Sequence, residues 1–143
     1  MASKMKIVID TNVFLVSISQ RSSWHWLFRA IIEKKLEVFI TTEILTEYEE
    51  KISQHWSAEV ANSVVRTLTE LSSVHLITTY FRLGLIVNDN DDNKFVDCAF
   101  AANTDYIVTN DKHFNILNSI NFPRINIITL QEFKLIFETK NNV

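Results

Sequence analysis

Glycine, proline and cysteine are almost absent from this chain of 143 residues, which has one of each, Gly84, Pro123 and Cys98. A single glycine excludes the glycine-rich loops that bind phosphate groups in P-loop and dinucleotide-binding proteins. A single cysteine excludes an internal disulfide framework and any metal site built from several thiolates. Because the sequence also has no flexible linker and no internal repeat, we expect one domain over residues 1–143.

Long apolar runs are missing as well. No stretch approaches the roughly 18–20 residues that a membrane-spanning helix requires. Lys4 and Lys6 precede only Ile7-Val8-Ile9, which is too short for the apolar part of a secretory signal. The apolar fraction of 47% and the charged fraction of 22% are typical of globular domains. We therefore expect a cytoplasmic protein that does not bind membranes.

The chain has no surplus of positive charge, since its formal net charge is −3. Proteins that bind nucleic acids usually carry a basic surplus, because contacts with phosphate supply much of their affinity. The acidity therefore argues weakly against a nucleic-acid substrate. If several acids are committed to a metal ion, however, the rest of the surface is less acidic than the total suggests.

Apolar runs of strand length alternate with segments of helical periodicity along the whole chain. This alternation predicts an α/β fold, a three-layer α/β/α sandwich around a central, mainly parallel sheet. The predicted strands are residues 5–9, 37–40, 74–78, 106–109 and 125–128, and the predicted helices are residues 12–19, 23–35, 43–54, 57–72, a segment ending near 103, a short helix or turn at 111–118, and 130–139.

Two aspartates directly follow predicted strands. Asp10 ends the run Ile7-Val8-Ile9, and Asp111 follows Tyr106-Ile107-Val108-Thr109-Asn110. Each has an ordinary explanation, because Asp is a common helix cap and a common turn residue. In an α/β sheet, however, ligands bind outside the carboxyl ends of the strands, where both aspartates are expected. Asn12 and Thr109 are polar neighbours that can orient these carboxylates.

Asp92 begins a predicted helix on its apolar side. At about 100° per residue, it falls within roughly 30° of the centre of a stripe formed by Phe95, Val96, Ala99 and Ala102. An acid in the first helical turn also interacts well with the helix dipole. That interaction does not explain an inward carboxylate, which is costly without a partner. We prefer Asp92 to its neighbours Asp89, Asp91 and Asp97; the same geometry places Asp91 at the edge of the stripe and Asp97 in solvent.

Glu47 belongs to a glutamate-rich helix, and its position is ambiguous. Ile44, Tyr48 and Ile52 mark the buried face of this helix, and Glu47 lies about 115° from its centre. Periodicity alone slightly prefers Glu49, and a solvated charged face also explains the segment. Acids gathered at one sheet edge repel one another and lose hydration, and a divalent cation with oxygen ligands offsets that cost. We therefore predict a metal-dependent site.

Four segments of the chain together resemble the PIN domain, a small α/β ribonuclease fold found in many bacterial toxins. The matching segments span nearly the whole chain, and the register of the second places Glu47 at the family's glutamate. One departure is Asn110, which replaces the usual glycine before the fourth acid, and we expect only a local change of turn. The segments are Val8-Ile9-Asp10-Thr11-Asn12-Val13, Ile44–Ile52, Asp91–Ala99 and Asp105–Asp111.

The resemblance implies a catalytic site in which Asp10, Glu47, Asp92 and Asp111 surround Mg²⁺ or Mn²⁺. Asn12 and Thr109 are our candidates for residues that support these ligands by hydrogen bonds. The resemblance further implies an endoribonuclease that is the toxin of a type II toxin–antitoxin system, with RNA as substrate, a cognate antitoxin protein as partner, and a homodimer as the expected assembly.

Other chemistries fit less well. The four histidines, of which His113 is expected at the surface, form no helical zinc motif. Trp24, Trp26 and Phe28 beside Arg21 and Arg29 could stack on RNA bases, although packing in the core is preferred and a dimer or antitoxin interface is a further reading. The alternative function is a non-catalytic PIN-like module that binds RNA or a partner protein, and the net acidity keeps this alternative open.

Overall fold

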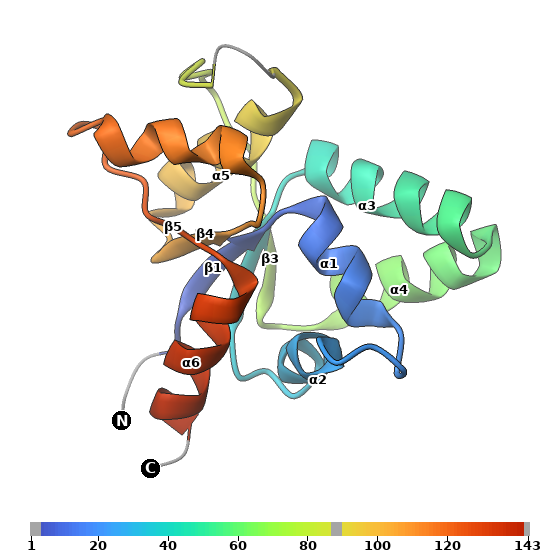
Figure 1. The fold of residues 1–143 in the computed structure, drawn as a ribbon. Coiled ribbons are helices and arrows are strands. Elements are labelled where there is room, and N and C mark those ends of the chain that lie inside the picture. Colours follow the sequence, from blue (N-terminus) through green and yellow to red (C-terminus); the bar gives the residue numbers. More distant parts are fainter. Residues whose placement is uncertain (1–3, 87–89, 142–143) are drawn as a thin grey trace.

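The computed structural model describes residues 4–86 and 90–141 and has a parallel sheet at its centre (Figure 1). The five strands lie in the order β3-β2-β1-β4-β5, and every neighbouring pair is parallel. The sandwich predicted from the alternation is therefore confirmed. The strands are β1 (Lys6–Ile9), β2 (Glu37–Ile40), β3 (Val74–Leu76), β4 (Tyr106–Val108) and β5 (Ile127–Ile128).

Helices cover both faces of this sheet. Figure 1 shows α1, α2 and α6 on one side and α5 with the η2 turns on the other, while α3 and α4 form a hairpin. The predicted helices are all present, with ends that differ by a few residues. They are α1 (Thr11–Ile18), α2 (His25–Ile32), α3 (Thr42–His55), α4 (Ala58–Glu70), η1 (Asn90–Asp92), α5 (Asn93–Ala102), η2 (Lys112–Ser119) and α6 (Leu130–Asn141).

The core forms where the apolar faces of these elements meet. The central strand β1 is fully buried from Ile7 to Ile9, as expected for a strand covered on both faces. Burial of such side chains supplies most of the free energy of folding. Among the described residues, no helix combines the length and the apolar character needed to cross a membrane.

One segment without regular structure, residues 77–86, lies against α5 and is called the covering segment below. The backbone N–H of Leu83 donates to Asp97 Oδ1 at 3.0 Å. Asn93 exchanges two hydrogen bonds of 2.9 Å with the backbone of Ile86. The prediction that Asp97 faces solvent is therefore wrong, since only 6% of Asp97 is exposed. Helical periodicity identified one buried face, whereas the covering segment buries a second.

Candidate metal centre at the carboxyl edge of the sheet

The register of β1 and β4 brings Asp10 and Asp111 together. Ile9 pairs with Val108, so the residues that follow, Asp10 and Thr109, are neighbours at the carboxyl ends of the two strands. The Thr109 hydroxyl donates to Asp10 Oδ2 at 2.8 Å and accepts from the backbone N–H of Asp111 at 3.0 Å. Thr109 thus links the two aspartates that follow predicted strands.

Asp10 is buried in an environment that disfavours its charge. Only 6% of the residue is exposed, and its side chain does not cap α1, which begins at the next residue. Burial raises the pKa of Asp10, and the nearby carboxylates of Asp111 and Glu47 raise it further. Hydrogen bonds from the Thr109 hydroxyl and the Thr11 backbone only partly offset these effects. Capping therefore does not explain this aspartate.

Glu47 reaches the same edge because the next residue fixes the orientation of α3. The buried hydroxyl of Tyr48 donates to the backbone oxygen of Ile9, and its ring stacks on Phe14 with centroids 4.4 Å apart. On the adjoining face of α3, Glu47 Oε2 accepts a hydrogen bond from the Thr11 hydroxyl. Glu49, which periodicity slightly preferred, is exposed. The structure thus brings Glu47, and not Glu49, to the end of β1.

Asp92 lies directly before α5 and points inward, as its place on the apolar stripe predicted. Only 8% of the residue is exposed, and its side chain does not cap the helix. Ligand atoms of Asp92, Asp111 and His113 all lie within 4.8 Å of one another. His113 Nδ1 is 3.5 Å from Asp111 Oδ1 and 4.0 Å from Asp92 Oδ2. These distances allow the three side chains to bind one cation.

Asp111 combines this position with a local structural role. Its Oδ1 accepts from the backbone N–H of His113 at 2.9 Å, which caps the η2 turns. The side chain of Asn110 accepts from the backbone N–H of Leu130 at 3.1 Å and so stabilises the start of α6. Asn110 does not have the positive φ that would require glycine. The exchange of glycine for asparagine is therefore accommodated locally, as expected.

The residues Asp10, Glu47, Asp92 and Asp111, called the acidic cluster from here on, offer oxygen donors from four separate elements. Mg²⁺ and Mn²⁺ prefer such carboxylate oxygens, and an imidazole nitrogen is a further donor suited to Mn²⁺. A bound divalent cation would stabilise the ionised form of Asp10, whose pKa is raised by burial and by nearby carboxylates. It would also fit the convergence of Asp92, Asp111 and His113. The donor set thus suits the metal that the resemblance implies.

Sequence reasoning missed two neighbours of the acidic cluster. The ammonium group of Lys94 lies 3.0 Å from Glu47 Oε1 and donates to the backbone oxygen of Asp91 at 2.5 Å. His113 is exposed, as expected, but stands at the acids. The position of a lysine ammonium group depends on the rotamers of a long side chain, which sequence periodicity does not reveal. Its contact with Glu47 could therefore not be deduced from the sequence.

Some of the predicted neighbours lie elsewhere. Asn12 is exposed, and within the described residues its side chain makes no hydrogen bond to the acidic cluster; Thr11 contacts Glu47 instead. A functional role for Asn12 stays a prediction. Asp91 is also exposed. Asp89, a rejected alternative to Asp92, lies outside the described residues.

Trp24, Trp26 and Phe28 pack against the core, which was the preferred prediction for them. Trp26 stacks on Phe133 and Phe137 of α6, with ring centroids 6.0 and 5.3 Å apart. Phe28 packs against Phe14, and Trp24 lies under the ammonium group of Lys134. These rings connect α2 with α1 and α6 and are half-buried.

Comparison with protein families identifies a match that contains the whole acidic cluster. The model of the PIN domain matches residues 6–113. An uncharacterized protein of Methanocaldococcus jannaschii, MJ1680, is 31% identical over 135 residues, which are 90% of this chain and 85% of that protein.

Solved structures share the fold at low sequence identity. VapBC2 of Rickettsia felis, bound to a DNA fragment from its promoter, has a TM-score of 0.60 at 19% identity and covers 87% of this chain and 98% of its own. The RRP44 PIN domain of T. brucei has a TM-score of 0.57 at 10% identity, with coverages of 98% and 84%. The PIN domain endonuclease Utp24 has a TM-score of 0.51 at 18% identity, with coverages of 87% and 84%.

Proposed function

The chain belongs to the PIN domain family, and from this premise we propose that it is a metal-dependent endoribonuclease that hydrolyses phosphodiester bonds in RNA. The observation that carries the proposal is the convergence of the acidic cluster at one edge of the sheet. Asp10 and Asp111 follow adjacent strands, Asp92 precedes α5, and Glu47 comes from α3. Packing of the fold alone does not require four carboxylates at this place, where burial of charge is costly.

The proposed ligands of Mg²⁺ or Mn²⁺ are Asp10, Asp92 and Asp111, with Glu47 as a further ligand or as the group that positions the water. The ion would supply Lewis-acid activation of a water and neutralise charge on the phosphoryl oxygens. Thr109 holds the Asp10 carboxylate by its hydrogen bond of 2.8 Å, so this ligand is fixed before the ion binds.

Glu47 is the proposed acceptor of the proton from the attacking water. It receives the Thr11 hydroxyl on one oxygen and the Lys94 ammonium on the other. Both contacts fix the orientation of the carboxylate that would accept the proton. Thr11 and Lys94 therefore act as positioning residues for Glu47. Asn12 remains a proposed polar neighbour of the site without a contact to these groups.

The proposed biological role is that of a toxin in a type II toxin–antitoxin system. It is supported by the fold that the chain shares with the VapBC2 complex of Rickettsia felis, which pairs two proteins. The expected partner is a small antitoxin that covers the acidic cluster. A cytoplasmic location and a homodimer remain predictions that accompany this role. The rival function is a PIN-like module that binds RNA or protein without cleaving it.

Incubation of the purified protein with single-stranded and structured RNAs in Mn²⁺, Mg²⁺ or EDTA tests the proposal. We expect cleavage that requires the metal and is lost in Asp10→Asn and Asp92→Asn. Glu47→Gln should lose most activity, whereas the exposed neighbour Glu49→Gln on the same helix should keep it. Cleavage that survives Asp10→Asn and Asp92→Asn would contradict the site. Absence of both cleavage and metal binding would favour the rival module.

A further inference from the structure

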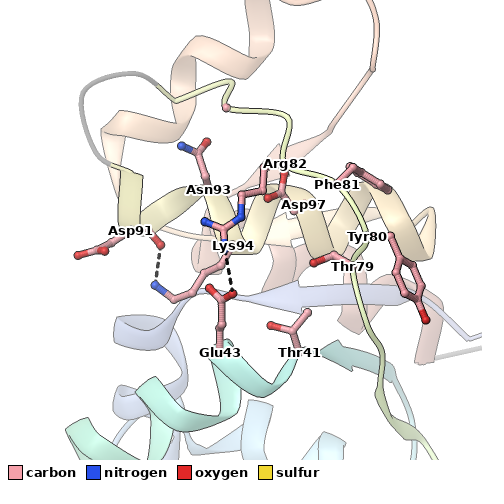
Figure 2. Close-up of a pocket in the computed structure, with 11 residues that line it drawn as sticks. Thr41, Glu43, Thr79, Tyr80, Phe81, Arg82, Asp91, Asn93, Lys94 and Asp97 are labelled. Carbon is pink, nitrogen blue, oxygen red and sulfur yellow. Dashed lines mark hydrogen bonds and ion pairs between the residues drawn. The ribbon is translucent and has the colours of Figure 1, made fainter.

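A hollow with a volume of about 600 Å³ opens beside the acidic cluster (Figure 2). Its walls are the start of α3, the covering segment, and the beginning of α5. The side chains that matter for its chemistry are Glu43, Tyr80, Arg82, Lys94 and Asp97. The volume is large enough for a nucleotide or a short peptide, so the lining must decide between them.

The wall formed by the covering segment is built into the fold. Its end is held by the paired hydrogen bonds between Asn93 and Ile86, and its middle by the bond from Leu83 to Asp97. Its start is held by a bond of 2.8 Å from the backbone N–H of Ile77 to the oxygen of Ile40. These anchors fix the backbone on both sides of Tyr80 and Arg82. The hollow is therefore a defined surface of the folded chain.

Lys94 joins the hollow to the acidic cluster. Its side chain lines the hollow, and its ammonium group lies 3.0 Å from Glu47 Oε1. A polymer whose reacting bond lies at the acidic cluster would therefore place the adjacent unit in the hollow. A nucleic-acid strand meets this requirement, because each nucleotide is followed by another at a short and regular distance.

The rim of the hollow carries the groups that bind single-stranded RNA in other proteins. Tyr80 is 90% exposed, and the Arg82 side chain is 87% exposed and lies 4.0 Å from Glu43 Oε1. Exposed rings stack on unpaired bases, and guanidinium groups pair with phosphates. In Figure 2, Arg82 extends toward Glu43, while the Tyr80 ring projects outward from the covering segment.

The lining argues against a protein segment as occupant. Protein interfaces usually have an apolar centre with charged residues depleted, whereas Glu43, Arg82, Lys94 and Asp97 gather here. Carboxylates at the wall can accept hydrogen bonds from the amino groups of bases, as they do from cytosine. The combination of a ring, two cations and acceptor groups suits a nucleotide.

We propose that this hollow binds the nucleotide next to the bond that is cleaved, with Tyr80 stacking on its base and Arg82 contacting its phosphate. The proposal rests on the proposed function, since RNA is the polymer that the acidic cluster acts on. Glu43 then has an opposing effect, because its carboxylate lies beside Arg82 and repels the phosphate. Because stacking on Tyr80 requires an unpaired base, the hollow selects single-stranded RNA. Its contribution is to substrate affinity more than to the chemical step.

The test uses the full chain with Asp10→Asn, which prevents cleavage, in Mg²⁺ with a short single-stranded RNA that contains 5-iodouridine. Irradiation should cross-link the RNA to Tyr80, identified by mass spectrometry of the digested protein. Tyr80→Ala should weaken RNA binding about tenfold, since stacking of one base contributes roughly that factor, whereas Tyr80→Phe should retain affinity. Phe122→Ala removes a comparably exposed ring, at 85%, far from the hollow in sequence and should change nothing.

The two charged residues of the rim should act in opposite directions. Arg82→Ala should lower the dependence of log affinity on log salt concentration by about 0.7, the value for one phosphate contact in a single strand. Glu43→Gln should strengthen RNA binding, because it removes the negative charge beside Arg82. Arg66→Ala, at an exposed position of α4, is the matched control for loss of a positive charge.

Outcomes for the hollow and for the proposed function are separable. If wild type cleaves RNA while Tyr80→Ala and Arg82→Ala bind it as wild type does, the nucleotide site is wrong and the ribonuclease stands. Cross-links confined to other residues would also overturn the site, and would leave the rim to a protein partner. If RNA cross-links to Tyr80 but wild type does not cleave, the site is supported and the catalytic proposal fails.

Discussion

Asp10 and Asp97 are two aspartates that are equally buried, each 6% exposed, in different regions of the molecule. Burial raises the pKa of both. At the sheet edge, Asp10 has the carboxylates of Asp111 and Glu47 nearby, which add to the cost of its charge. On the outer face of α5, Asp97 accepts a backbone N–H from the covering segment and is near Arg82, and both lower its pKa; the carboxylate of Glu43 raises it by less.

This difference fits the proposed role of Asp10 as a metal ligand and a structural role of Asp97 in holding the covering segment. The contacts of Asp97 account for its burial, because its oxygen satisfies the N–H of Leu83. Asp10 accepts hydrogen bonds from the Thr109 hydroxyl and the Thr11 backbone but lies near two further carboxylates, an arrangement that a bound cation would stabilise. Burial and a raised pKa are common to both aspartates; they differ because hydrogen bonding and Arg82 outweigh Glu43 at Asp97, whereas the charged neighbours of Asp10 that affect its pKa are both carboxylates.

The largest expected difference between the two aspartates is in catalysis. Asp10→Asn should lower kcat for RNA cleavage by at least about a hundredfold, because it removes a proposed metal ligand. Asp97→Asn should change kcat little, and any effect should appear in KM through the adjoining hollow. Steady-state kinetics in Mn²⁺ measures both. Equal losses of kcat in the two variants would remove the distinction.

Metal binding should distinguish the same pair through thermal stability. At a concentration of about a hundred times Kd, Mn²⁺ should raise the Tm of wild type and of Asp97→Asn by about 5–10 °C. The Tm of Asp10→Asn should not respond. Without metal, Asp10→Asn should be at least as stable as wild type, because it removes a buried charge among like charges. Differential scanning fluorimetry with and without EDTA measures these values.

Lys94 offers a further test of the charge in the acidic cluster, because its ammonium group forms an ion pair with Glu47. This ammonium lies 3.0 Å from Glu47 Oε1, so we expect it to compete with a divalent cation for this carboxylate. Lys94→Gln should therefore raise Mn²⁺ affinity about fivefold, equivalent to about 1 kcal/mol, while RNA cleavage falls. Calorimetric titration with Mn²⁺ provides the affinity. An unchanged or weaker affinity would show that Lys94 does not compete for the metal site.

Asp97 should determine how firmly the covering segment is attached. Asp97→Ala leaves the N–H of Leu83 without its acceptor and should destabilise the fold by about 1–2 kcal/mol in urea unfolding. Asp97→Asn keeps an acceptor and should cost less. Faster hydrogen exchange of residues 77–86 in Asp97→Ala would locate the effect, and exchange unchanged from wild type would refute it.

The pH dependence of stability tests the charge on Asp97. Because its pKa in the folded protein is raised, the ionised form favours the unfolded chain. The stability associated with protonated Asp97 is therefore fully present below the pKa of the unfolded chain. It is lost as the pH rises through the folded pKa, so the unfolding free energy of wild type should fall relative to that of Asp97→Asn over this window. A difference that is constant with pH would contradict the assignment.

The fold and most of the acidic cluster could be predicted from the sequence, because both depend on local patterns. Alternating strands and helices indicate the sheet, and the apolar stripe of α5 selects Asp92. The choice between Glu47 and Glu49 needed more, since it depends on how Tyr48 docks on the end of β1. The resemblance to the PIN domain supplied that register, whereas periodicity slightly favoured Glu49, which is exposed.

What could not be predicted depends on contacts between distant segments. The burial of Asp97 follows from the covering segment, which has no helical or strand periodicity to announce that it packs on α5. The end point of Lys94 depends on a flexible side chain that crosses from α5 to α3. Both omissions concern the hollow beside the acidic cluster, so the sequence indicated the acidic edge of the sheet better than the neighbouring surface.

Anomalous diffraction from crystals soaked in Mn²⁺ tests the central claim most directly, because it locates the ion without an assay of activity. The account predicts a manganese peak in contact with carboxylate oxygens of Asp10 and of Asp92 or Asp111, and loss of this peak in Asp10→Asn. An acidic cluster without manganese, at an ion concentration that supports RNA cleavage in solution, would contradict it.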